Sequence, residues 1–280
     1  MDEWKDAFAE QSPPLKALRA TARQLAGADW PGRSRLQDIV AGAGICTASG
    51  LPLQLAPPGG GGESYEQRLY ARGEMGFREH NWHDLFNVLT WLAFPRAKAA
   101  LNARHHAALP AVRAGGRGPV RDALTLFDES GVIVISADAE LLHMIRGFRW
   151  KPLFWERRAA VLAGMDFLLF GHALCEKMLV PYKGITGRGL LLEVGRDFLE
   201  LPFAEQLAQI DSRVASWISD PQTLRHTHEL APLPVLGVPG WCADNAQSAY
   251  YDDRDHFRPG RGRRLPASPA AGPVVPEEIR

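Results

Sequence analysis

The sequence is poor in cysteine and carries no excess of charge of either sign. Its 280 residues include only three cysteines, which lie far apart and form no Cys-x-x-Cys pair: Cys46, Cys175 and Cys242. This argues against a disulfide framework or a thiolate zinc site and indicates a reducing compartment. Thirty-two basic and thirty-two acidic side chains cancel, so no overall field attracts nucleic acid or an anionic membrane.

The chain also has little that would direct it into a membrane. Its start, 1–5, is acidic and lacks the basic segment and apolar core of a signal peptide. The most apolar run, 159–175, is interrupted by Asp166 and His172, and it is shorter than the ~20 residues that a membrane span needs. Basic residues gather only at 258–264. We therefore expect a cytoplasmic protein that binds neither membrane nor nucleic acid.

Proline and glycine divide the chain into three parts. Two prolines and four glycines in a row at 57–62 indicate a flexible break. We expect an N-terminal helical segment at 1–58 that packs on a main domain at 63–259. A disordered tail is expected at 260–280, where arginine, proline and alanine predominate.

The pattern of the main domain is typical of the α+β class. Apolar residues at helical spacing predict helices at 81–94, 95–109, 139–148 and 203–218. Two β-rich runs joined by a short acidic loop that ends in Gly131 predict a hairpin at 121–136. A strand–helix–strand unit at 165–194 indicates a parallel crossover beside this hairpin. The expected fold is thus a mixed sheet packed by several helices, with a proline- and glycine-rich C-terminal ribbon at 220–259.

The predicted helix at 81–94 carries a polar stripe with unusual chemistry. His83 and Asn87 fall on one narrow stripe with Asp84 at its flank, and apolar side chains fill the opposite arc. Such groups bind metals, move protons or satisfy buried hydrogen bonds, so a site and a structural network are both open. Asn81 is expected to cap the helix, and Asp84 also interacts favourably with the helix dipole.

A second polar pair follows a predicted buried strand. His172 and Glu176 are spaced i, i+4, which puts an imidazole and a carboxylate on one helix face, as in helices that present two metal ligands. His172 also lies just after the C-terminal end of the strand at 165–170, where open α/β sheets tend to bind ligands. The alternative is a hydrogen-bonded pair that only steadies the helix.

Three further charged residues are candidates for a role in chemistry. Asp122 falls within a predicted apolar strand, where a carboxylate needs a partner. Lys183, in a glycine-containing basic loop, and Arg157 are candidates for neutralising an anionic substrate, although the P-loop pattern is absent. The acidic residues of the predicted hairpin loop, Asp128 and Glu129, are assigned to the turn, where such residues are common for local reasons.

Five blocks of sequence occur together in one order, at 81–87, 91–95, 121–129, 170–177 and 236–241. With these blocks the chain resembles, over about residues 64–260, a bacterial family known as domain of unknown function 3025. The resemblance implies one integrated domain. It brings no activity, cofactor or site residue.

The leading hypothesis from the residues is a metal-dependent hydrolase that acts on a phosphoester. A divalent ion such as zinc, manganese or magnesium would activate water on four ligands: His83, Asp84, His172 and Glu176. His83, Asp122 and Lys183 are the candidate catalytic residues, with Asp122 as a base or further ligand. The hypothesis requires His83 and His172, about ninety residues apart, to converge.

The competing hypothesis is a non-enzymatic binding or assembly protein. In that case the stripe around His83 is a satisfied buried network that fixes how its helix docks. A small molecule would be the partner of the enzyme, whereas the sequence does not identify the protein partner that an assembly role would need.

Overall fold

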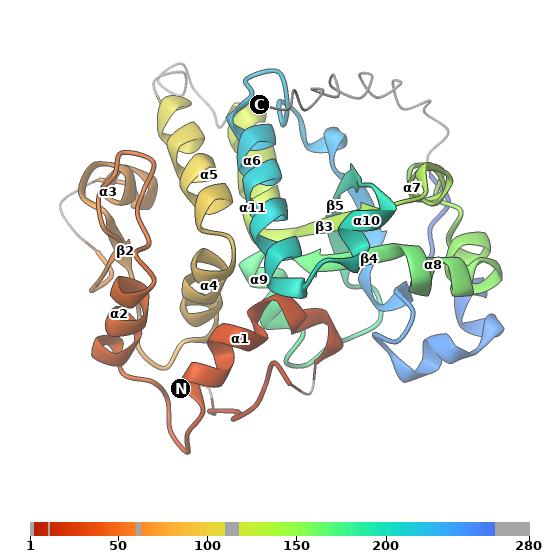
Figure 1. Cartoon of the computed structure of the whole chain (residues 1–280), viewed down its shortest axis with the longest axis horizontal. Helices are drawn as coiled ribbons and strands as arrows, with labels where there is room; N and C mark the ends of the chain where they lie inside the picture. The colour runs from red at the N-terminus through yellow and green to blue at the C-terminus, as the bar shows by residue number, and fades with distance from the viewer. Residues whose placement is uncertain (1–2, 11, 60–62, 110–117, 261–280) are drawn as a thin grey trace, which may run out of the picture.

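A four-stranded mixed sheet lies at the centre of the molecule, with helices around it (Figure 1). The computed structural model describes residues 3–10, 12–59, 63–109 and 118–260. Its strands in spatial order are β4 (Met165–Leu169), β3 (Gly131–Ser136), β5 (Thr186–Glu193) and β6 (Ala231–Pro234). β3 is parallel to β5 and antiparallel to β4, and β6 is antiparallel to β5. The predicted α+β class with a mixed sheet is confirmed.

β3 is the central strand because its sequence suits burial on both faces. All six of its residues are buried, and four of them are Val or Ile, which the pleated backbone accommodates well. A strand with parallel pairing and both faces covered has a continuous apolar run instead of alternation. Ile133, for example, lies opposite Leu168 on one side and Leu190 on the other.

Helices account for most of the remaining regular structure. In Figure 1, α4, α5, α6 and α11 lie to the left of the central strands and α7 and α8 to the right. The longer helices are α2 (Arg33–Gly42), α3 (Tyr65–Arg72), α4 (Trp82–Ala93), α5 (Pro95–Ala107), α6 (Pro119–Ser130), α7 (Ala139–Arg146), α8 (Arg158–Gly164) and α11 (Phe203–Ser219). The shorter ones are α1 (Arg19–Ala22), α9 (His172–Lys177) and α10 (Arg196–Glu200).

The helix that carries the polar stripe is held at both ends by local chemistry. The Asn81 side chain accepts a hydrogen bond from the Asp84 N–H at 3.0 Å, so the predicted cap of α4 is confirmed. Pro95 opens α5 directly after Phe94, where a missing N–H is tolerated. α4 contacts α9, and α5 contacts α11, which joins distant parts of the sequence.

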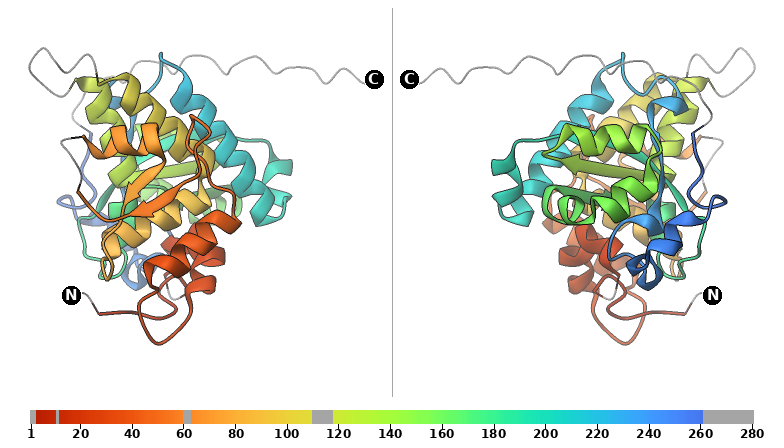
Figure 2. Two further views of the ribbon diagram at one scale, coloured as in Figure 1. Left: turned by 90° about the vertical axis from the view of Figure 1, so that its left-hand side faces the viewer. Right: turned by 90° about the vertical axis from the view of Figure 1, so that its right-hand side faces the viewer.

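The N-terminal region packs against the central sheet and α4. The 3₁₀ helix η1 (Pro13–Leu18) contacts β4 and α4, and its Leu15 and Leu18 are fully buried. A small parallel sheet of β1 (Gln54–Ala56) and β2 (Glu74–Gly76) lies beside α3, in front in the left view of Figure 2. The predicted tail and the glycines at 60–62 lie outside the described residues.

The predicted hairpin at 121–136 is wrong in its first half, which forms the helix α6. Alternation was the wrong period, because the buried residues Ala123, Leu124 and Phe127 follow helical spacing. Pro119 at the first helical position also favours a helix start. Only β3 remains of the hairpin. Asp128 and Glu129 therefore lie in the last helical turn of α6 instead of a β-turn.

The predicted strand–helix–strand unit has its three elements but not the predicted pairing. β4, α9 and β5 follow one another along the chain, yet β3 lies between β4 and β5 in the sheet. The parallel crossover joins β3 to β5. Along the chain β4 lies within this connection, and it pairs with the other edge of β3 in the antiparallel direction. The difference follows from α6, since a helix before β3 leaves both edges of β3 available for pairing.

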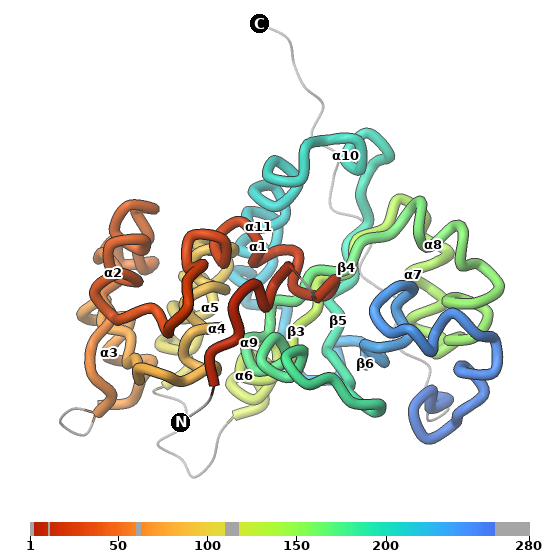
Figure 3. Tube along the Cα trace, turned by 90° about the horizontal axis from the view of Figure 1, so that it is seen from below, coloured from red at the N-terminus to blue at the C-terminus, as the bar shows by residue number. Residues whose placement is uncertain are grey.

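The proline-rich C-terminal ribbon lies on the core beside α7 and α8 (Figure 3). It contains β6 and short 3₁₀ turns, and the Asn245 side chain ties it together by donating to the carbonyls of Leu236 and Val238. Arg158 of α8 donates to the Asn245 carbonyl at 2.9 Å. Among the described helices, none combines the length and apolar character required to cross a bilayer.

Candidate functional site

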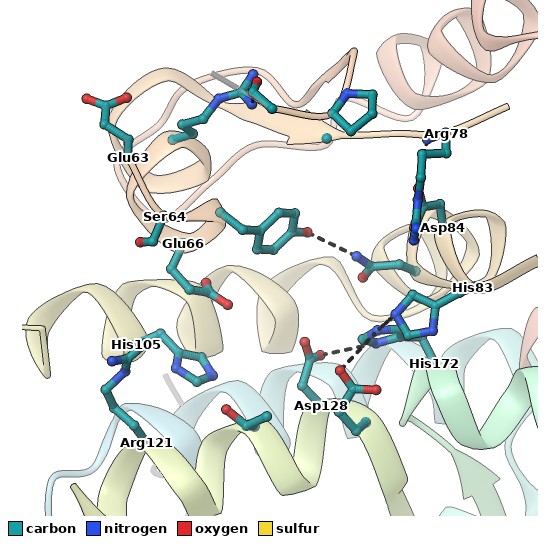
Figure 4. Close-up of a pocket in the computed structure, with 18 residues that line it drawn as sticks. Glu63, Ser64, Glu66, Arg78, His83, Asp84, His105, Arg121, Asp128 and His172 are labelled. Carbon is teal, nitrogen blue, oxygen red and sulfur yellow. Dashed lines mark hydrogen bonds and ion pairs between the residues drawn. The ribbon is translucent and has the colours of Figure 1, made fainter. Parts of the chain in front are cut away.

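A cavity of about 590 Å³ lies among the helices beside the sheet and is lined mainly by polar side chains. Helices α3, α4, α5, α6 and α9 all contribute to its wall. Figure 4 shows His83 and His172 facing each other at one end, with Glu66, His105 and Arg121 toward the other. The cavity therefore holds both histidines of the sequence-based hypothesis.

His83 and His172 converge although 89 residues separate them. His83 extends from the first turn of α4, and His172 is the first residue of α9. Their Nε2 atoms are 3.1 Å apart, and the ring planes are at 72°. The His172 side chain is 4 % exposed and that of His83 is 34 % exposed, so His83 is the more open to the cavity.

A carboxylate completes this group. Glu129, in the last turn of α6, has Oε1 3.7 Å from His172 Nε2. One ligand atom from each of His83, His172 and Glu129 can be chosen so that all three lie within 4.8 Å of one another. Burial, followed by the nearby Asp128 carboxylate, raises the pKa of Glu129, and a cation between the three side chains would reverse that effect.

Each histidine has a second carboxylate behind its other ring nitrogen. Glu176 Oε2 is 3.2 Å from Nδ1 of His83, and Asp128 Oδ1 is 3.8 Å from Nδ1 of His172. The Glu176 carboxylate is within hydrogen-bond distance and selects the His83 tautomer whose Nε2 carries the free lone pair. Asp128 is too far from His172 Nδ1 for a hydrogen bond and acts on that ring through its charge. The free lone pair of His83 would then point into the space between the two Nε2 atoms.

His172 is held in its neutral form. Burial lowers its pKa to about 4, and the charges of Lys98 and His83 act in the same direction, against Asp128. A neutral imidazole is the form that binds a metal ion.

Gly171 permits the approach of α9 to α6 that brings His172 beside Glu129. A Cβ at Gly171 would lie 2.4 Å from the Ser130 backbone nitrogen and 2.5 Å from that of Gly131. The N–H groups of Phe170 and Gly171 both donate to the Gly131 carbonyl, at 3.0 and 2.9 Å. Only glycine allows two backbones to come this close without displacement.

A buried lysine organises the floor of the cavity. The Lys98 ammonium donates to the carboxylate of Asp128 and, at 2.9 Å, to Oδ1 of Asn87. Asn87 in turn donates through Nδ2 to the Tyr65 hydroxyl at 3.0 Å. Burial alone would raise the pKa of Asp128, but the positive charge of Lys98 keeps it below its ordinary value. Asp128 therefore remains ionised next to His172.

Glu66 is the carboxyl of this cavity that titrates near neutrality. It projects from the first turn of α3, and its Oε2 accepts a hydrogen bond of 2.7 Å from the Asn102 amide. Burial, followed by the charge of Asp128, raises the pKa of Glu66 to about 7. The group can thus hold or release a proton close to physiological pH.

The other residues of the sequence-based hypothesis lie apart from the two histidines. Asp84 lines the cavity but forms an ion pair with Arg78, with 2.8 Å between Oδ1 and Nη2. Asp122 is exposed on α6 and does not line the cavity. Lys183 forms an ion pair with Asp253 in the C-terminal ribbon.

Sequence reasoning missed six residues of this site: Tyr65, Glu66, Lys98, Arg121, Asp128 and Glu129. The last two were assigned to a β-turn, and helical periodicity over 119–130 would have placed them one turn beyond the buried Leu124 and at the site. Lys98 had a weaker signal, a charge flanked by alanines in the predicted helix at 95–109. Tyr65 had no signal that separates it from an ordinary surface tyrosine.

The fold and the cavity together define an α+β protein with a convergent histidine–carboxylate group. The chain belongs to the family described as protein of unknown function (DUF3025), whose model matches residues 55–261. The resemblance seen in the sequence is therefore confirmed, and all the cavity-lining residues fall in the matched range. Neither the curated proteins nor the solved structures contain a match to the chain.

Proposed function

We propose that this protein is a hydrolase that holds one divalent metal ion on His83, His172 and Glu129. The observation that carries the proposal is the pair of Nε2 atoms that face each other at 3.1 Å, each ring backed by a carboxylate at Nδ1. Two nitrogen ligands about 2.0–2.1 Å from a tetrahedral ion lie about 3.3 Å apart. The spacing of the two histidines is close to this value.

The donor set fits a catalytic ion better than a structural one. Two histidines and one glutamate leave a fourth position open, as in catalytic zinc sites, whereas structural sites use four protein ligands. Such an ion lowers the pKa of bound water and polarises the substrate. The open position would face the cavity, because His83 and Glu129 both line it and remain partly exposed.

The remaining residues of the site then have defined tasks. Glu176 orients the His83 imidazole by a hydrogen bond, a role in which carboxylates typically change metal affinity by about 10- to 100-fold. Asp128 places a negative charge beside the His172 ring. Lys98 keeps Asp128 ionised. Glu66 lies toward the other end of the cavity and, with a pKa of about 7, can hold or release a proton there.

We retain a phosphoester as the substrate class, but the side chain that would neutralise it differs from the two that the sequence suggested. Lys183 is paired with Asp253, and Arg157 with Asp138 and Glu140. The cavity instead presents Arg121, whose buried Nε makes no hydrogen bond within the described residues. A guanidinium with donors to spare suits a phosphate group.

The proposal is tested by metal analysis and turnover on the same samples. We expect one divalent ion per chain in the parent and none in His83→Ala or His172→Ala, with His228→Ala as the exposed control. p-Nitrophenyl phosphate, bis-p-nitrophenyl phosphate and p-nitrophenyl acetate separate monoester, diester and carboxyl ester hydrolysis. A parent that holds no metal at any pH, or that holds it and hydrolyses none of the three, contradicts the proposal.

One observation favours the competing role of a binding or assembly protein. Asn87 and Thr90 of the polar stripe are satisfied inside the fold, by Lys98 and by the Phe86 carbonyl. This part of the stripe is a structural network, as that hypothesis requires. If His172→Ala lowers the free energy of unfolding by several kcal/mol while the parent holds no metal, the whole stripe is structural.

A further inference from the structure

Tyr65 is placed at the cavity by the first turn of α3. Ser64 caps this helix in a reciprocal capping box with Gln67, so the position of the next residue is well determined. Tyr65 lines the cavity and is 38 % exposed. The hydroxyl accepts a hydrogen bond from Asn87, which lies one helical turn after His83 on α4. Side chains at this spacing are neighbours, with Cβ atoms about 6 Å apart.

The direction of the hydrogen bonds leaves the Tyr65 proton free. An ammonium has donors only, so Lys98 must face the oxygen of the Asn87 amide. The amide nitrogen then points to Tyr65 and donates to its oxygen. The Tyr65 O–H has to point elsewhere, and no acceptor for it is found within the described residues.

Electrostatics keep this hydroxyl protonated. Burial, followed by the negative charges of Glu66 and Asp128, raises the pKa of Tyr65 well above its ordinary value. Tyr65 is therefore a neutral donor at all physiological pH values and does not serve as a base. A fixed donor aimed into a metal-containing cavity is the arrangement that stabilises charge developing on a substrate oxygen.

We propose, on the basis of the proposed function, that the Tyr65 hydroxyl donates a hydrogen bond to a non-bridging phosphoryl oxygen of the substrate in the transition state. The oxygen of the activated water bonds to phosphorus as the bond from phosphorus to the alcohol oxygen breaks. The alcohol oxygen leaves with the electron pair of that bond, and one proton of the water ends on the alcohol. The Tyr65 proton stays on Tyr65 throughout.

The same network connects Tyr65 to the metal ligands. Lys98 contacts Asp128, which faces His172, and it also contacts Asn87, which holds Tyr65. One buried ammonium thus orients a metal ligand and the substrate-facing donor together. The Lys98 side chain, 3 % exposed, thus makes contacts on both sides of this network that an apolar side chain could not make.

The test is Tyr65→Phe beside Tyr182→Phe, in which an exposed tyrosine away from the cavity loses the same atom. We expect kcat to fall about 100-fold in Tyr65→Phe, with KM raised by no more than about tenfold and metal affinity within about twofold of the parent. Tyr182→Phe should match the parent. An unchanged kcat, or a kcat that falls together with metal affinity, overturns the assignment, since the second result marks a structural role.

A second measurement does not depend on turnover. Calorimetric titration of inorganic phosphate into the metal-loaded parent and into Tyr65→Phe compares binding of a tetrahedral oxyanion. We expect phosphate to bind about tenfold more weakly to Tyr65→Phe than to the parent, because one hydrogen bond is lost. Equal phosphate affinities of the two proteins overturn the assignment. A parent that binds metal and phosphate but turns over no substrate contradicts the hydrolase proposal while leaving the role of Tyr65 supported.

Discussion

Two lysine–aspartate ion pairs of this protein have different roles because one is buried and the other is exposed. Lys98 and Asp128 meet beneath the cavity, with side chains 3 % and 13 % exposed. Lys183 and Asp253 meet at the surface, with side chains 47 % and 33 % exposed. Both pairs are formed between segments far apart in sequence. The buried pair contacts two groups of the candidate site, Asn87 and His172.

The histidine beside each pair makes the contrast sharper. Burial lowers the pKa of His172 and of His256. His256, however, accepts a hydrogen bond of 3.1 Å from the Gly184 backbone and so secures a loop, whereas His172 directs Nε2 at His83 across a cavity. A buried histidine beside a charged pair is therefore common structural chemistry. Convergence with other ligands around a cavity is what distinguishes the candidate site.

The largest expected effect comes from removing each lysine in turn. Lys98→Met leaves Asp128 buried without a partner, which should lower the free energy of unfolding by about 3–5 kcal/mol. Lys183→Met, at an exposed pair, should lower it by less than about 1 kcal/mol. Urea denaturation of the two metal-free variants measures both. Equal losses would show that the two pairs do not differ as described.

Adding a methyl group between α6 and the start of α9 should have the next largest effect. Gly171→Ala places a Cβ 2.4 Å from a backbone nitrogen, so the two segments must separate. We expect the free energy of unfolding to fall by about 2–3 kcal/mol. Metal binding should weaken as well, because His172 moves away from Glu129. Gly164→Ala is the matched control, because a Cβ there meets nothing within 4 Å. A Gly171→Ala protein with parent stability and metal affinity would contradict this role.

A smaller effect should separate the carboxyls of the cavity from those of the surface. Glu66 has a pKa of about 7 in the fold against 4.5 when unfolded, so between these pH values the folded state binds more protons. Stability therefore falls as pH rises from about 4.5 to about 7, by about 2 kcal/mol. Glu66→Gln should remove this fall, and Glu205→Gln on the exposed face of α11 should retain it. The measurement is the free energy of unfolding of the metal-free proteins at pH 5 and at pH 8. If the difference between the two pH values is the same in Glu66→Gln as in the parent, the raised pKa of Glu66 is refuted.

Local patterns in the sequence predicted the elements whose stability is local. The Asn81 cap, the stripe of α4, the start of α5 at Pro95 and the apolar strand β3 are all confirmed. Each depends on capping, helical spacing or β-branched residues within one segment. The error at α6 arose because five residues, 123–127, fit alternation and helical spacing almost equally, and the burial that selects between them is tertiary.

The site was predictable only in part, because it depends on approach between segments. The histidines were identifiable by type and by position on helices. Their convergence depends on the contact between α4 and α9 and on the missing side chain at Gly171, which lets two backbones approach closely. The spacing of residues along the sequence reveals neither feature. Glu129 went unrecognised for the same reason, since its role requires α6 to be a helix and to end against α9.

The most direct test of the central claim is the metal affinity of the parent beside Glu129→Gln and Glu176→Gln. In the proposed site Glu129 is a ligand of the ion and Glu176 lies at Nδ1 of His83, whereas the sequence-based hypothesis made Glu176 a ligand. Competition against a chromogenic chelator should show one ion per chain, a loss of about 10- to 100-fold in Glu176→Gln, and a larger loss in Glu129→Gln. A parent without metal, or a larger loss in Glu176→Gln, would contradict the account.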